Sequence, residues 1–208
     1  MAVAEQIDLM REGVLAGVPL PYVLRLPAPM SDEELIAFSR RNRPFQIECN
    51  SEGELEVMSP PGAQGSHWEA QAIFELGVWT RSNGGIFFSS NGGFRLPNGS
   101  MRSPDAAWVS QARWDALSKE QRSRYPPLCP DFVIEILSAT DSRKRLEAKM
   151  EMWTANGAQL AWMIDPYART LSIYRPGAET GLLESPDSVE AGEPVAGFRL
   201  STRLLWDV

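Results

Sequence analysis

The chain has 208 residues, a formal net charge of −7, and apolar (43%) and charged (23%) contents that are typical of a globular protein. This acidic balance excludes a surface that attracts phosphate groups everywhere, so any binding to nucleic acid must use a local basic strip. The length suits one domain with a sizeable core. We therefore expect a single domain over residues 1–208, with an N-terminal extension (1–30) and a loop-rich C-terminal tail (177–208).

The sequence also indicates where the protein works. No apolar run approaches the ~20 residues that a helix needs to cross a bilayer. Residues 1–17 mix acidic and basic side chains with apolar ones, unlike the basic start and unbroken apolar stretch of a signal peptide. Cys49 and Cys129 lie far apart without CxxC spacing, which predicts two buried free thiols rather than a zinc site. These features predict a cytoplasmic protein that does not enter a membrane.

The first half of the chain predicts a hairpin between two helices. Ser31 and Glu34 form a capping-box pattern that begins the first helix. Residues 45–49 and 54–58 form two short strand-like runs around a polar, glycine-containing loop, which predicts a hairpin. Residues 64–83 then predict a long helix. Its large apolar side chains recur at helical spacing, at Trp68, Ala72, Leu76 and Trp79.

Strands and helices are mixed in the second half. Strands are expected at residues 86–89 and 93–96, as a second pair, and at 106–110, 132–137, 160–164 and 171–174, the last two as a hairpin. Helices are expected at residues 114–121 and 142–156, and the tail contributes two short edge strands. This order predicts an α/β (α+β) domain with a central mixed β-sheet flanked by helices.

Glu135 is the first candidate for chemistry. Side chains alternate between the two faces of a strand, so Glu135 shares a face with Val133 and Leu137 in the most apolar run of the chain. An ionised carboxylate there is costly unless a metal ion, a cationic side chain or water compensates for it. The alternatives are a buried ion pair and a strand whose polar edge faces solvent.

Asp105 and Lys149 complete a candidate constellation. Asp105 follows Pro104 at the start of a predicted strand, where it is either a turn residue or half of a two-carboxylate site of the kind that binds magnesium. Lys149 lies on the helix after the Glu135 strand, at the edge of its apolar stripe. It either extends to solvent or bends toward the carboxylates.

Glu69, on the earlier long helix, is a fourth candidate, and His67 lies beside it. Glu69 is either an outer carboxylate of the site or a solvated glutamate near a helix N-terminus. His67 either assists at the site or is an ordinary residue at the helix start.

These residues resemble the motif of the PD-(D/E)XK nuclease superfamily, and most closely the Uma-type restriction-endonuclease family of bacteria. Three stretches carry the match: RSPDAAWV (102–109), CPDFVIEILSATDS (129–142) and residues 149–166. Met58-Ser59-Pro60 with Gly62 also fits, and the resemblance covers roughly residues 30–176. One departure is that Leu137 occupies the place of the superfamily's lysine, so the resemblance assigns that role to Lys149.

The resemblance implies a restriction-endonuclease-like fold and metal-assisted hydrolysis of phosphodiester bonds in DNA. Asp105 and Glu135 would bind Mg²⁺ or Mn²⁺, which would activate a water molecule and stabilise charge on the phosphate. Lys149 would orient the water or neutralise the transition state, and Glu69 would hold a second metal or its water. A homodimer is expected from the general symmetry of oligomers.

Two other functions stay open at this point. The acidic net charge and the lack of an obvious DNA-reading motif favour a catalytically silent nuclease-like fold that acts in binding or assembly. A hydrolase for another phosphate ester could use the same metal site. Candidates for a basic strip are clustered, although solvated helix charges are the alternative: Arg122, Arg124, Arg143, Lys144 and Arg145.

Overall fold

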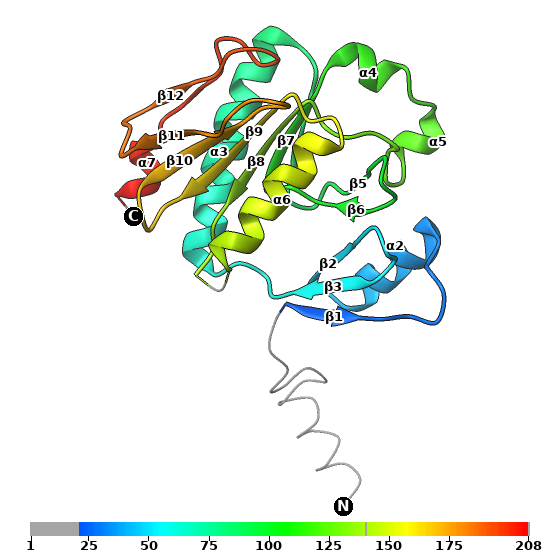
Figure 1. The fold of residues 1–208 in the computed structure, drawn as a ribbon. Coiled ribbons are helices and arrows are strands. Elements are labelled where there is room, and N and C mark those ends of the chain that lie inside the picture. Colours follow the sequence, from blue (N-terminus) through cyan, green and yellow to red (C-terminus); the bar gives the residue numbers. More distant parts are fainter. Residues whose placement is uncertain (1–20, 140, 208) are drawn as a thin grey trace, which may run out of the picture.

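In a computed structural model, the protein is built around two main β-sheets with helices packed against them (Figure 1). The structure describes residues 21–139 and 141–207, so the expectations about residues 1–17 and most of the N-terminal extension lie outside the described residues. Within those described residues, no helix combines the length and the apolar character needed to span a bilayer. Cys49 and Cys129 are buried and free, as predicted.

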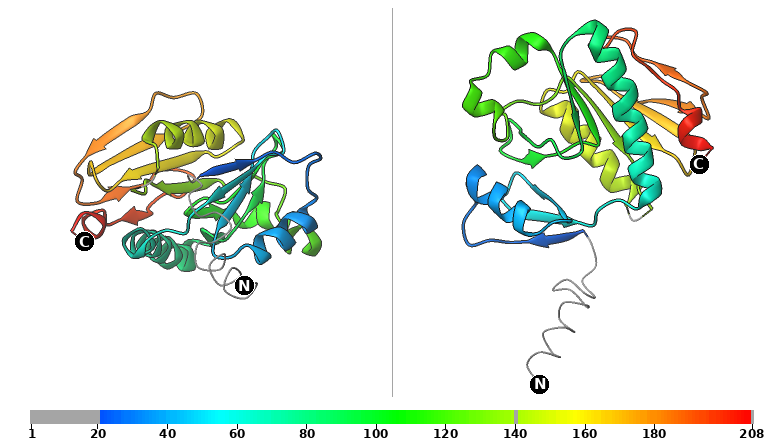
Figure 2. Two further views of the ribbon diagram at one scale, coloured as in Figure 1. Left: turned by 90° about the horizontal axis from the view of Figure 1, so that it is seen from below. Right: turned by 180° about the vertical axis from the view of Figure 1, so that it is seen from behind.

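The larger sheet has six strands in the order β11-β10-β9-β8-β7-β4, and only β8 and β9 are parallel neighbours. Its strands are β4 (Ile86–Ser89), β7 (Ala106–Val109), β8 (Phe132–Ile136), β9 (Leu160–Asp165), β10 (Thr170–Tyr174) and β11 (Gly181–Glu184). Helices α3 (Ala63–Asn83) and α6 (Arg143–Ala155) cover its opposite faces, as the front and back views show (Figures 1 and 2). The predicted central mixed sheet flanked by helices is confirmed.

The alternation of side chains along β8 explains this three-layer arrangement. Phe132 and Ile134 pack in the core under α3, together with Trp68 and Leu76 of that helix. Val133 and Leu137 instead pack under α6, in a second core with the α6 side chains Leu146, Met150 and Trp153. Glu135 has the same parity as Val133, so its side chain points into the layer between the sheet and α6.

The smaller sheet has five strands in the order β1-β3-β2-β6-β5, and helix α2 (Asp32–Arg41) packs against it. Its strands are β1 (Tyr22–Leu24), β2 (Gln46–Cys49), β3 (Leu55–Met58), β5 (Phe94–Arg95) and β6 (Met101–Arg102). The predicted hairpin is confirmed as β2–β3, and its loop is closed by Asn50 Oδ1, which accepts from the backbone N–H groups of Glu52 and Glu54 at 3.0 Å. The capping box of Ser31 and Glu34 also forms.

Two expectations about local structure were wrong. Residues 86–89 and 93–96 do not pair, because β4 joins β7 in the larger sheet while β5 joins β6 in the smaller one. A turn does form between them, but β7 is buried along its whole length and offers β4 a better partner than the two-residue β5. The helix expected at 114–121 is two short helices, α4 (Gln111–Asp115) and α5 (Lys119–Arg122), because Ser118 and Gln121 form a new capping box between them.

The tail has more structure than the expected loops and two edge strands. Besides β11, it forms a two-stranded ribbon of β12 (Val189–Glu190) and β13 (Arg199–Leu200) and the short helix α7 (Arg203–Trp206). Phe198 stacks on Trp162 of β9, with ring centroids 5.7 Å apart. The tail therefore completes the core on the α3 face of the large sheet.

Candidate active site

The structure brings Asp105 and Glu135 together at one end of two neighbouring strands. In the β7–β8 ladder, Ala106 pairs with Ile134, so continuing the register by one residue places Asp105 directly opposite Glu135. Asp105 Oδ2 accepts the backbone N–H of Ile136 at 2.7 Å, which fixes its side chain against β8. Like charges on directly opposed residues destabilise a sheet, so this pair requires a compensating cation.

Lys149 bends toward the carboxylates instead of extending to solvent. Its Nζ lies 2.9 Å from Glu135 Oε1 and 3.1 Å from Glu48 Oε1. Trp153, one turn further along α6, donates its indole N–H to the same Glu135 oxygen at 2.7 Å. Glu135 is only 3% exposed, and helix α6 fixes its position with two donors, the Lys149 ammonium and the Trp153 indole N–H.

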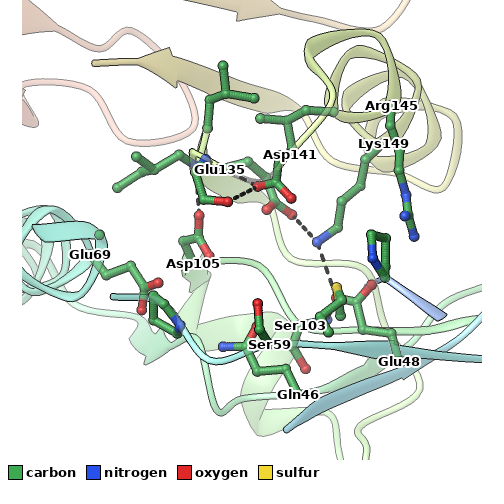
Figure 3. A pocket seen from close by; sticks show the side chains of 18 of the residues that line it. Gln46, Glu48, Ser59, Glu69, Ser103, Asp105, Glu135, Asp141, Arg145 and Lys149 are labelled. Atoms are coloured by element: carbon green, nitrogen blue, oxygen red, sulfur yellow. Dashed lines mark hydrogen bonds and ion pairs between the residues drawn. The ribbon is translucent and has the colours of Figure 1, made fainter. Parts of the chain in front are cut away.

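Glu69 reaches the same cavity from helix α3. In Figure 3 it enters from α3 and Lys149 enters from α6, on opposite sides of Asp105. Its Oε2 accepts a hydrogen bond of 2.9 Å from the Ser90 hydroxyl. The cavity has a volume of about 420 Å³, and all four predicted site residues line it. His67 is not one of the described residues that line this cavity.

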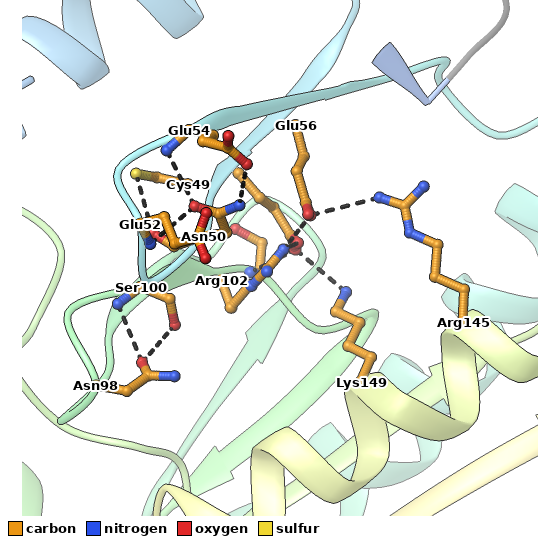
Figure 4. A network of polar contacts seen from close by, with 12 residues as sticks. Cys49, Asn50, Glu52, Glu54, Glu56, Asn98, Ser100, Arg102, Arg145 and Lys149 are labelled. Carbon is orange, nitrogen blue, oxygen red and sulfur yellow. Dashed lines mark hydrogen bonds and ion pairs between the residues drawn. The ribbon is translucent and has the colours of Figure 1, made fainter. Parts of the chain in front are cut away.

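Two site residues were missed from the sequence, Glu48 and Arg102. Glu48 accepts from the Arg102 guanidinium at 2.8 Å and from the Ser103 backbone N–H at 2.9 Å, in addition to Lys149. Arg102 also pairs with Glu56, and Arg145 of α6 reaches Glu56 at 3.5 Å (Figure 4). Once a β2–β3 hairpin is predicted, Glu48 and Glu56 are opposed like charges, and this was the available signal that cations must lie nearby.

The site contains carboxyl groups with opposite pKa shifts. Burial raises the pKa of Asp105 well above its ordinary value, and the nearby charges of Glu135 and Glu69 raise it further. Burial also raises the pKa of Glu135, despite the opposing effect of Lys149, and that of Glu69, despite its bond to Ser90. For Glu48, burial acts in the same direction, but Lys149 and Arg102 outweigh it, so its pKa is lowered.

The residues present fit a hard divalent cation. Asp105 Oδ1 and Glu135 Oε2 accept no hydrogen bond from any described residue, whereas the other oxygen of each carboxylate does. Within residues 21–139 and 141–207, no three His, Cys, Asp or Glu side chains are placed to bind a metal ion together. Magnesium commonly uses only one or two protein carboxylates and takes its other ligands from water and phosphate, so the Asp105–Glu135 pair is sufficient.

Comparisons with known proteins agree with this architecture. The model of the Uma2 family, described as "Putative restriction endonuclease", matches residues 32–203. The chain belongs to the Uma2 family. A crystal structure from Anabaena variabilis, described as a putative nuclease belonging to DUF820, superimposes with a TM-score of 0.67 at 20% identity, covering 86% of this chain and 98% of the other. That likeness shows a shared fold. The comparison with curated proteins found no similar sequence.

The expected basic strip is divided in this Uma2 chain. Arg143 and Arg145 lie at the start of α6 and pair with acidic side chains, and Lys144 beside them is exposed. Arg122 and Arg124 lie elsewhere, beside the smaller sheet, and also form ion pairs. The five residues therefore do not form one continuous phosphate-binding surface.

The raised pKa of Asp105 predicts a stability cost at the site. The folded protein holds the Asp105 proton to a higher pH than the unfolded chain does, so the free energy of unfolding falls as pH rises between the two pKa values. We expect Asp105→Asn to be more stable than wild type at neutral pH in a chelator, by on the order of 1 kcal/mol. The difference should shrink toward pH ~4, where an unfolded aspartate is half protonated. Thermal unfolding across pH measures this, with the exposed Glu151→Gln as the control. A less stable Asp105→Asn at neutral pH would contradict it.

Glu48 should show the opposite behaviour. Its lowered pKa means that its stabilising contribution is complete above the unfolded pKa and is lost as pH falls through the folded one. Glu48→Ala leaves Lys149 and Arg102 with fewer partners in a buried region, which should cost about 3 kcal/mol at neutral pH. Glu190→Ala, which removes an exposed pair with Arg199, should cost less than about 1 kcal/mol. Equal losses in urea unfolding of the two variants would show that the Glu48 network is not structurally special.

Proposed function

We propose that this Uma2 protein is a metal-dependent DNA endonuclease that hydrolyses phosphodiester bonds at the Asp105–Glu135 pair. The observation that carries the proposal is the juxtaposition of two opposed carboxylates with a buried lysine, in a chain of a family described as "Putative restriction endonuclease". Asp105 and Glu135 would bind Mg²⁺ or Mn²⁺. A cation held there would supply Lewis-acid chemistry and stabilise negative charge on the phosphate.

Lys149 is proposed to act as a charged donor. Although burial alone lowers its pKa, Glu135, Glu48 and Asp105 raise it overall, so the ammonium keeps its proton at neutral pH. It therefore cannot serve as a base. It can donate to an attacking water or to a phosphate oxygen, where its charge would stabilise the transition state.

Glu69 is proposed as the outer carboxylate of the site. Its raised pKa makes it a stronger proton acceptor than an ordinary glutamate, and it lines the same cavity as Asp105. The bond from Ser90 leaves its other oxygen, Oε1, without a donor among the described residues. Glu69 could thus hold a water molecule next to the scissile phosphate or take its proton.

The test combines metal binding with cleavage. We expect wild type to bind Mn²⁺ in calorimetry and the Asp105→Ala/Glu135→Ala double variant to show no binding. In cleavage of supercoiled plasmid, Asp105→Ala, Glu135→Ala and Lys149→Ala should each lose at least about 10²-fold in rate. Glu151→Ala removes an exposed acid from the same helix as Lys149 and should cleave like wild type.

Two outcomes would overturn the proposal. Wild type that binds no Mn²⁺, even with DNA present, would assign the chain to the catalytically silent nuclease-like folds. Cleavage that survives in the double variant would place the chemistry elsewhere. Hydrolysis of a small phosphate ester without cleavage of DNA would identify the protein as a different phosphoesterase.

We further propose that the protein works in the cytoplasm as a symmetric homodimer. Phe74 and Val78 on α3 and Phe87 on the edge strand β4 are 64%, 46% and 41% exposed, which makes this side of the larger sheet a candidate interface. Light scattering should give twice the monomer mass, and Phe74→Glu should reduce it to the monomer. A wild type that is monomeric at all concentrations would exclude this part of the proposal.

A further inference from the structure

A second cavity adjoins the candidate active site. It has a volume of about 740 Å³ and lies between the α2–β2 segment, the chain after β4 and residues 122–126. The two cavities share four lining residues, Gln46, Glu48, Met58 and Ser103. The linings of the two cavities are also hydrogen-bonded to each other, because Ser90 lines the second cavity and its hydroxyl donates to Glu69, which lines the first. A ligand held at Asp105 could therefore extend into the second cavity.

The charge of this cavity is opposite to that of the active site. Its ionised lining consists of four arginines, namely Arg40, Arg43, Arg122 and Arg124, and one carboxylate, Glu48. Glu48 is already paired with Lys149 and Arg102. Arg40 and Arg43 are exposed and form no ion pair with any described residue. Arg122 and Arg124 pair with acidic side chains, so the free positive charge at this cavity comes from Arg40 and Arg43. In a chain with a net charge of −7, these two unpaired guanidinium groups mark a site for an anion.

Aromatic side chains form much of the rest of the wall. Phe45, Trp114 and Tyr125 line the cavity and are each partly exposed. The guanidinium of Arg122 lies over the Trp114 ring, 5.5 Å from its centroid. Arginines interleaved with aromatic rings are the usual means of binding unpaired nucleic acid, because phosphates pair with the cations and bases stack on the rings.

We propose that this cavity binds a nucleotide of an unpaired DNA strand next to the scissile phosphate. Arg40 and Arg43 would bind backbone phosphates at the rim, and the base would lie against the aromatic wall. The volume lies within the range of small-ligand cavities, so it suits a nucleotide outside a duplex better than a duplex backbone. This inference rests on the proposed function, since it names the form of nucleic acid that the same site takes.

The experiment measures binding without cleavage. Fluorescence anisotropy in EDTA would follow a labelled DNA strand of about 15 nucleotides, its duplex, and a fully abasic strand of the same length. The test variant is Arg40→Ala/Arg43→Ala. The matched control, Arg41→Ala/Arg81→Ala, removes two exposed arginines that do not line the cavity. Thermal unfolding would show that both variants are folded.

We expect the strand to bind wild type more tightly than the duplex or the abasic strand does. The test variant should bind it at least 10-fold more weakly, and the slope of log K against log salt should fall by about 1.4, or 0.7 for each lost phosphate contact. The control should bind within about twofold of wild type. Equal weakening in both variants, equal binding of the abasic strand, or a preference for duplex would each overturn the inference.

Failure of this inference can be told apart from failure of the nuclease proposal. Strand binding that depends on Arg40 and Arg43, in a wild type that never cleaves DNA with Mn²⁺, would support the cavity and reject the nuclease. Normal cleavage of DNA by a test variant that binds the strand like wild type would reject the cavity alone.

Discussion

The ammonium group of Lys149 binds carboxylates from both main sheets, and the arrangement of the site depends on it. Glu135 belongs to the larger sheet, Glu48 belongs to the smaller one, and Lys149 reaches both from α6. Buried carboxylates are tolerated only when a cation or several donors compensate for them. This lysine therefore does more than neutralise one acid, since it fixes the smaller sheet against the layer in which the candidate chemistry takes place.

The buried carboxyl groups of the site are compensated unevenly by cations and hydrogen-bond donors. Glu48 receives two cations, Lys149 and Arg102, and the Ser103 backbone N–H, and together they lower its pKa although Glu56 shares Arg102 and Glu135 shares Lys149. Around Asp105, burial and two further acids outweigh Lys149 and the Ile136 backbone N–H, and the pKa is raised. The first part behaves as a structural ion-pair network, whereas the second gathers the carboxyl groups of Asp105, Glu135 and Glu69, whose ionised forms Lys149 alone does not balance. A divalent cation would supply the missing charge.

Local patterns in the sequence predicted the parts of this fold that depend on local interactions. The β2–β3 hairpin, both long helices and the face on which Glu135 lies follow from periodicity, turns and caps. The partners of Glu48 could not be predicted in this way, because Lys149 is 101 positions away and Arg102 is 54 positions away. The predicted pairing of residues 86–89 with 93–96 was wrong for the same reason, since nothing in the local sequence of β4 and β5 indicates that they join different sheets. Asp105, Glu135 and Lys149 could be proposed because a family resemblance supplied the long-range information.

The acidic net charge and a nucleic-acid substrate are compatible because the charges are segregated. All four arginines that were candidates for a basic strip pair with neighbouring acids and present little free charge. The guanidinium groups without ion partners at the second cavity instead come from α2 and the turn after it, a segment in which no phosphate-binding motif was visible. A metal site needs excess negative charge, whereas a phosphate site needs excess positive charge. In this protein the two kinds of charge lie in separate but adjoining cavities. Glu48, paired with Lys149 and Arg102 and lining both cavities, lies at the boundary between them.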